Sequence, residues 1–303
     1  MKKIIMLFMA ATGAVTCTAQ GFYFKAGLGY AMPQATQSMD GTATPTSGTR
    51  TFTGSGTNTT AAYSIDKASF STGLQGLVSV GYMFNKNVGI DLGLSLNVTT
   101  TTYNFTDYNV PSGSSLYDIQ IIQKARSPKM LMPAVVMQTG GDMLNLYTRV
   151  GLALPLSTQI DQHQIFTNQP GNGAVSTQDF LWVNSNSFSL GFTAAAGVQY
   201  RLNNKVKIWG EASFLSLAMY IKEANLTDVT VDGATGYLTQ IPVDERKVTF
   251  SKDFTAATND YYHQPAFSQP FSNITIAAGV AFDLDHNSRS NEKGKNDVKG
   301  RRR

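Results

Sequence analysis

The sequence predicts an all-β protein in which eight antiparallel strands close into an up-and-down barrel. Three observations lead to this prediction. Eight segments alternate between apolar and small or polar residues, which is the pattern of a strand with one apolar face. The connections between these segments are short and long in turn. Charged residues make up only 15% of the chain, whereas Gly, Thr, Ser and Asn, which are weak helix formers, are abundant.

The alternation is clearest between Val88 and Val98, where every second residue is apolar. In chain order, the predicted strands cover residues 22–32, 70–84, 88–103, 130–139, 144–154, 187–200, 206–220 and 273–283. The fourth is the least regular, because both of its faces are apolar and Pro133 lies inside it. The seventh is expected to contain a bulge, since Leu215 and Leu217 break the parity of the preceding apolar residues.

The connections give the stronger indication. Short turns rich in Asn and Gly, residues that tolerate positive φ, lie at 85–87, 140–142 and 203–205. The other connections are long and cover roughly residues 33–69, 104–129, 157–185 and 221–270. This asymmetry is typical of bacterial outer-membrane barrels, which have short periplasmic turns and long extracellular loops. We therefore expect a transmembrane barrel in the outer membrane, with four long extracellular loops and both termini on the periplasmic side.

Aromatic residues near both ends of the strands support a membrane location, since aromatic side chains favour the two interfaces. Near the short turns lie Phe22, Phe24, Tyr82, Phe84, Tyr200 and Phe282, and nearer the long loops lie Tyr30, Phe70, Tyr103 and Phe188. No segment has the roughly 20 consecutive apolar residues that a transmembrane helix needs. A closed barrel is the other structure that satisfies every backbone group in hydrocarbon.

The two ends of the chain differ from the region between them. Residues 1–19 have the pattern of a secretory signal peptide, with cleavage expected after Ala19. The barrel domain is expected to cover residues 20–284, and a basic tail, predicted to be disordered in the periplasm, covers residues 285–303. Cys17 is the only cysteine; lipidation at this position stays open, but loss with the signal is favoured because the preceding residues lack the usual lipoprotein pattern.

The net charge of +4 does not predict nucleic-acid binding, because it is located at the ends of the chain. The tail alone holds seven basic and three acidic residues, and the chain between the signal and the tail is slightly acidic. Neither a nucleotide-binding motif nor a calcium-loop spacing is present, so we expect no cofactor and no metal.

With these features, the chain resembles the small outer-membrane barrel family typified by OmpA and OmpX, over about residues 21–284. Locally, the resemblance lies in the opening strand from Phe22 to Tyr30 and in the closing residues Gly279, Phe282 and Leu284. These three are similar to the C-terminal signal that the barrel-assembly machinery reads, although here a tail follows them. The resemblance implies outer-membrane lipid and lipopolysaccharide as neighbours. Because the tail is short, we expect no peptidoglycan-binding domain of the OmpA kind. It does not imply one activity, since members include adhesins, stress-related barrels and lipid-modifying enzymes.

The inside of an eight-stranded barrel is narrow and filled by side chains. Polar residues predicted to point inward are Lys25, Gln75, Asp91, Asn97, Asn145, Arg149, Gln199 and Glu211. Because an unpaired buried charge is unfavourable, we expect two ion pairs, Lys25–Asp91 and Arg149–Glu211, that form a structural polar plug.

The predicted function is that of a non-enzymatic surface barrel, acting through its long loops in adhesion, surface interaction or envelope structure. The first loop is polar and expected to be mobile, and strands of the fourth loop are expected to continue above the membrane, around residues 229–233 and 247–250. One alternative is a small pore, disfavoured because eight strands leave no aqueous channel. Another is a lipid-modifying enzyme, disfavoured because His163, His263 and His286 have no nucleophile and carboxylate at motif spacing.

Overall fold

The computed structural model describes residues 21–34, 48–53, 60–63, 69–112, 115–169, 174–252 and 262–284. The expected signal peptide with Cys17, most of the first long loop and the basic tail lie outside these residues, so the boundaries proposed for them stay predictions. The described part of the chain consists almost entirely of strands. It contains no helix long and apolar enough to cross a bilayer.

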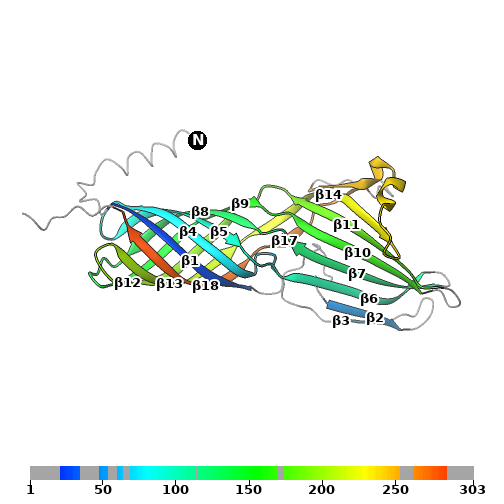
Figure 1. Ribbon diagram of the computed structural model, residues 1–303, viewed down its shortest axis with the longest axis horizontal. Helices are drawn as coiled ribbons and strands as arrows, with labels where there is room; N and C mark the ends of the chain where they lie inside the picture. The colour runs from blue at the N-terminus through cyan, green and yellow to red at the C-terminus, as the bar shows by residue number, and fades with distance from the viewer. Residues whose placement is uncertain are drawn as a thin grey trace, which may run out of the picture.

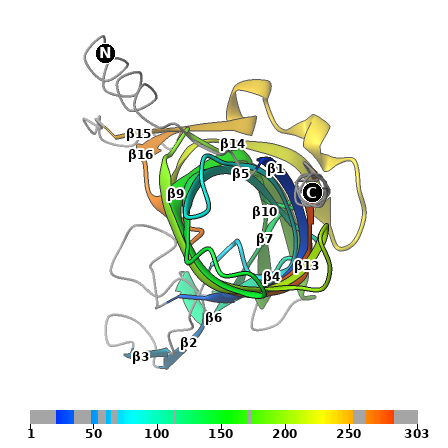
Figure 2. The same ribbon diagram turned by 90° about the vertical axis from the view of Figure 1, so that its left-hand side faces the viewer.

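Eight strands close into an antiparallel barrel in the order β1-β18-β13-β12-β9-β8-β5-β4 (Figure 1). They are β1 (Gly21–Pro33), β4 (Gly73–Met83), β5 (Val88–Asn97), β8 (Lys129–Gln138), β9 (Leu144–Ser157), β12 (Gly191–Arg201), β13 (Val206–Ser216) and β18 (Asn273–Asp283). The first and last strands close the ring, with Tyr23 opposite Asp283 at one end and Pro33 opposite Asn273 at the other. Figure 2 looks along the barrel and shows this ring. The predicted eight-stranded barrel is confirmed.

Beyond the barrel, the long connections form a second sheet (Figure 1). Its strands are β2 (Gly48–Thr53), β3 (Thr60–Tyr63), β6 (Thr102–Ser112), β7 (Ser115–Ala125), β10 (Ile160–Gln169), β11 (Ser176–Asn186), β14 (Ala218–Val231), β15 (Lys247–Ser251) and β16 (His263–Pro265), and β17 (Ser268–Pro270) pairs with β14. Two short 3-10 helices, η1 (Tyr237–Gln240) and η2 (Val243–Arg246), connect β14 to β15. We call this second sheet the outer sheet.

The outer sheet corrects the expectation for the loops. The fourth loop does continue as strands, since β14 pairs with β15, as predicted. The second and third loops, for which the sequence predicted no strands, are the hairpins β6–β7 and β10–β11, and β7 pairs with β10 to join them. The predicted seventh strand divides at the expected irregularity: β13 ends at Ser216, and β14 begins at Ala218 and enters the outer sheet.

The outward face of the barrel is apolar, as a lipid-facing surface requires. Exposed side chains distributed around the ring are Leu28, Val80, Leu92, Val135, Leu146, Val150, Phe192, Ile208 and Ile276. Near the short turns the predicted aromatic belt includes a contact between Phe22 and Tyr82, whose ring centroids are 4.8 Å apart. The barrel therefore presents an apolar band with an aromatic border to its surroundings.

The predicted aromatic belt near the long loops is only partly correct. Tyr30 and Phe188 are exposed, as expected, but Phe70 and Tyr103 are buried inside the molecule. Phe70 departs from the prediction because β4 begins only at Gly73, whose φ of +107° is in the left-handed region that favours glycine. Residues before this turn do not follow the strand's alternation, so parity does not predict the direction of the Phe70 side chain.

Candidate functional site

The middle of the barrel interior holds the four charged residues predicted to point inward. Arg149 contacts both acids: its Nη1 lies 3.2 Å from Asp91 Oδ1, and its Nε donates to Glu211 Oε2 at 3.1 Å. Lys25 Nζ lies 3.6 Å from Glu211 Oε2. The structure thus contains the expected Arg149–Glu211 pair. The expected Lys25–Asp91 pair is wrong, because Lys25 turns to Glu211 and Asp91 pairs with Arg149.

Two tyrosines hold the carboxylates of this ion cluster. Tyr23 donates its hydroxyl hydrogen to Asp91 at 2.7 Å, and Tyr147 donates to Glu211 at 2.8 Å. The Tyr23 ring needs the glycine opposite it, since a Cβ on Gly81 would lie 2.1 Å from Tyr23 Cζ. Glycine in these strands therefore makes room for the rings that position the acids.

A layer of amides and hydroxyls lies above the ion cluster, toward the outer sheet. Gln75 donates to Asn97 at 3.2 Å, and Thr275 donates to Gln75 at 3.3 Å. Asn273 extends the layer to the backbone carbonyl of Ser71 at 3.0 Å. All five residues are buried, so these polar groups satisfy one another inside the barrel.

An apolar cluster covers this polar layer at the outer end of the barrel. We call it the apolar plug; it consists of Phe70, Tyr103, Ala125, Met130, Ala153, Ile160, Leu215, Leu217, Met219 and Phe271. Phe70 and Phe271 are 0% exposed, and their ring centroids are 5.8 Å apart. The plug combines side chains from the barrel strands and from the bases of the long loops, so it joins the outer sheet to the barrel.

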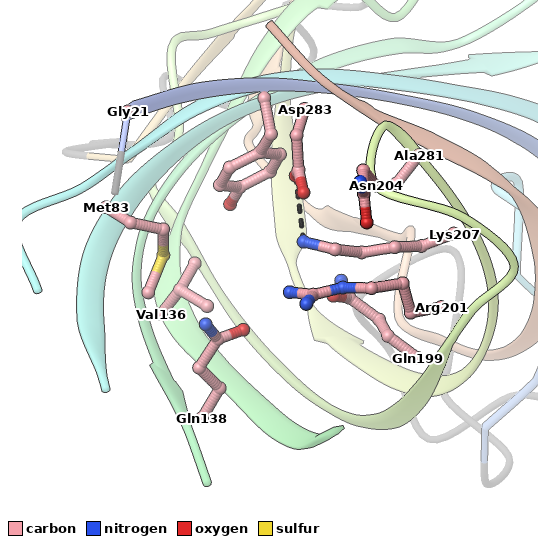
Figure 3. A pocket seen from close by; sticks show the side chains of 11 residues that line it. Gly21, Met83, Val136, Gln138, Gln199, Arg201, Asn204, Lys207, Ala281 and Asp283 are labelled. Atoms are coloured by element: carbon pink, nitrogen blue, oxygen red, sulfur yellow. Dashed lines mark hydrogen bonds and ion pairs between the residues drawn. The ribbon is translucent and has the colours of Figure 1, made fainter. Parts of the chain in front are cut away.

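A cavity of about 190 Å³ lies at the short-turn end of the barrel (Figure 3). Arg201 and Lys207 extend side by side in it, and Lys207 Nζ donates to Asp283 at 2.8 Å. Gln138 and Gln199 add amides to the wall. This cavity is a polar vestibule at the predicted periplasmic mouth.

Above the plug, the face of the outer sheet that continues the barrel interior carries a groove. The base of this inner face is a row of hydrogen-bonded amides, in which Gln123 donates to Gln162 at 2.7 Å and Asn184 donates to the same oxygen at 3.1 Å. The row lies next to Ile160, which belongs to the plug. Farther out, a cavity of about 400 Å³ opens between β7, β10, β11 and the segment with η1 and η2. We call this cavity the outer groove.

The opposite face of the outer sheet carries pairs of polar and charged side chains. His163 Nδ1 lies 3.0 Å from Asp179 on the neighbouring strand. The Lys247 ammonium, 2.7 Å from Glu223, holds the pKa of that carboxyl below its ordinary value by donating a hydrogen bond to it. This face therefore differs in chemistry from the inner face.

The geometry around the histidines bears on the alternative of a lipid-modifying enzyme. The residues directly opposite His163 on the adjoining strands are Ile122 and Leu181, neither of which is a nucleophile. His263 lies in β16 and is exposed, and His286 lies outside the described residues. Within the described part of the chain, no three His, Cys, Asp or Glu side chains are grouped as a metal site would need.

The closing residues expected to form the assembly signal lie at the short-turn end of β18. Phe282 and Leu284 are exposed on the outside of the barrel, at 40% and 61%. Gly279 has a packing role, since a Cβ there would lie 2.0 Å from the Ala26 carbonyl oxygen on the paired strand.

Comparisons with solved structures find small barrels of other bacteria with low similarity. CarO of Acinetobacter baumannii is 13% identical, with a TM-score of 0.28, over 69% of this chain and 92% of that chain. CarO2 of the same organism is 15% identical, with a TM-score of 0.28, over 71% and 94%. Ail, the attachment invasion locus protein of Yersinia pestis, solved with the heparin analogue sucrose octasulfate, is 11% identical, with a TM-score of 0.25, over 86% and 97%. At these TM-scores, none of the three carries a functional argument.

Curated proteins show no match to this chain. A family model described as the outer membrane protein beta-barrel domain matches residues 4–237, which is more than half of the chain. This match agrees with the closed barrel and its apolar outer band, and the protein is one of the bacterial outer membrane. The chain belongs to the outer membrane protein beta-barrel domain family.

Proposed function

We propose that this protein is a sealed, non-enzymatic barrel that binds an extracellular ligand at the cell surface through its outer sheet. The single observation that carries the proposal is that the long loops form one sheet with an open groove on its inner face. Irregular loops would suffice to shield the surface, whereas a paired sheet holds its side chains in fixed positions, as a binding site needs.

The layers inside the barrel support a sealed interior. The ion cluster, the amide layer and the apolar plug lie one above another between the vestibule and the outer groove. An eight-stranded barrel has no space for a channel beside such layers. No specific observation favours the alternative of a small pore, and stable large openings in planar bilayers would contradict the sealed interior.

The proposed surface function is tested by shortening the fourth loop. Replacing residues 222–266 with a short Gly-Ser linker removes most of β14 together with η1, η2, β15 and β16, and opens one side of the outer groove. We expect bacteria that carry this variant to lose most of their binding to epithelial cells and immobilised extracellular matrix. The matched control replaces residues 35–68 of the first loop with the same kind of linker. Unchanged binding by the first variant, with normal surface levels, would leave a purely structural role.

We also propose that Phe282 and Leu284 form the assembly signal, with lipopolysaccharide and lipid around the folded barrel. Both residues are exposed and lie beside the last pairing of β18. We expect Phe282→Ala to reduce the folded fraction in outer-membrane extracts several-fold, because the assembly machinery would recognise the strand less well. The melting temperature of the fraction that does fold should stay nearly the same.

The control for this prediction is Ile276→Ala. Ile276 is exposed on the same face of β18 but far from its end, so it matches Phe282 in environment and not in position. Equal losses of folded protein in the two variants would show that the outward apolar surface matters and that a terminal signal does not.

A further inference from the structure

The outer groove combines aromatic rings with side-chain amides. Its wall includes the rings of Tyr117, Phe166, Phe180 and Trp182 and the amides of Gln164 and Gln178. Trp182 is buried, Gln178 is exposed and the others are half-buried, so both kinds of group are accessible from the cavity. The volume of about 400 Å³ is within the range of small-ligand sites and accommodates two or three sugar rings.

The register of β10 and β11 interleaves the two kinds of group. Gln164 lies opposite Phe180, and Phe166 lies opposite Gln178. One step toward the barrel, Trp182 lies opposite an amide as well. Each ring of one strand therefore faces an amide of the other, because alternation on both strands brings these side chains to the same face.

We propose that the outer groove binds a neutral oligosaccharide. A pyranose ring has a face of C–H groups and a rim of hydroxyls, so it needs aromatic rings and hydrogen-bonding side chains at short intervals. Aromatic faces attract the polarised C–H groups, and a glutamine amide both donates to and accepts from hydroxyls. The alternation of Phe180 and Trp182 with the opposing amides supplies both kinds of contact at the spacing of neighbouring residues.

The charges of the groove select among saccharides. Among the described residues that line it, none is Lys or Arg, and the one charged side chain is Glu245, which is exposed at the rim. Sulfate, phosphate and carboxylate groups are recognised by Arg and Lys, which pair with them directly. The groove therefore favours an uncharged saccharide over a sulfated or acidic one.

The inner end of the groove adds a further hydrogen-bond donor. The Trp182 Nε1 is buried and has no acceptor among the described residues. Trp182 and Gln164 also line a second cavity of about 160 Å³, next to the outer groove. A hydroxyl that reaches this shared wall would give the indole an acceptor. This favours a ligand of several sugar rings that extends along the sheet, rather than a single sugar ring.

This inference rests on the proposed function, and its test uses the full-length barrel in lipid nanodiscs. The chain has two tryptophans, so Trp209→Phe leaves Trp182 as the only indole and reports on the groove. The probes are cellohexaose, maltohexaose and chitohexaose, with sucrose octasulfate as the anionic comparison. We expect at least one neutral hexasaccharide to shift the Trp182 emission in a saturable way.

Variants on the two faces of the sheet separate the possible outcomes. Gln178→Ala, at an exposed position, and Phe180→Ala should each weaken binding about tenfold or more, the loss expected for one good contact. His163→Ala, on the opposite face, should leave binding unchanged. Failure of all three neutral probes, preference for sucrose octasulfate, or equal binding by the groove variants and the parent would overturn the inference.

The proposed function can fail separately from this inference. The loop-shortened variant could lose cell binding while glycosidase treatment of the target cells leaves binding by the parent protein unchanged. In that case the surface function stands and the saccharide ligand is wrong. A protein partner would then be the occupant. If loop shortening leaves cell binding unchanged, the proposed function itself is wrong.

Discussion

Arg149→Met is expected to lower the free energy of unfolding of the barrel by about 3–5 kcal/mol, the usual result of removing one partner of a buried ion pair. Arg149 lies between Asp91 and Glu211 and contacts both. Without its guanidinium, the two buried carboxylates share one cation, Lys25, which lies 3.6 Å from Glu211. Asp91 would keep only its hydrogen bonds from neutral hydroxyls. The measurement is the temperature at which the folded barrel converts to the unfolded form on a gel.

Two further variants identify the cause of this loss. Arg126→Met removes an ion pair with Asp161 in the outer sheet, where the side chains are 49% and 29% exposed, so it should cost less than about 1 kcal/mol. Adding Asp91→Asn to Arg149→Met restores the balance of charge and should recover part of the lost stability. A parental melting temperature for Arg149→Met would show that the cluster contributes no net stability.

The barrel was predictable because the two sides of its wall face different environments. Lipid outside and polar side chains inside impose a period of two, so the sequence correctly predicted that Asp91 and Glu211 are buried. Pairing inside the barrel was not predictable to the same degree. Lys25 and Asp91 were matched by their distance from the strand ends. Barrel strands are tilted and staggered, so equal residue counts do not give equal positions across the interior.

The outer sheet was harder to predict because lipid does not contact it. On β10 the inner face carries Gln162 and Gln164, and the opposite face carries His163, so both faces read as polar. The pairing of the outer-sheet strands depends on hairpins that lie side by side in the structure but are distant in sequence. The signal that was available is the opposition of aromatic and amide residues, such as Phe180 and Gln164, within a connection treated as a loop.

Phe271→Ala is expected to destabilise the barrel by about 3–5 kcal/mol, as truncation of a fully buried phenylalanine does elsewhere. Phe271 is 0% exposed, packs on Phe70 and bonds through its backbone N–H to Leu217 at 3.0 Å. The cavity left by its ring would lie at the junction of barrel and outer sheet. We therefore expect a lower melting temperature and faster proteolysis of the outer hairpins, with the barrel strands cut later.

Phe188→Ala is the matched control for this prediction, because Phe188 is 76% exposed and the same truncation there leaves no cavity. The double variant of Phe70 and Phe271 should lose less stability than the sum of the two single variants, since each ring is part of the other's packing. Full additivity, or an effect at Phe271 as small as that at Phe188, would show that the plug does not hold the two sheets together. The outer groove would then need another source of the rigidity that we assign to it.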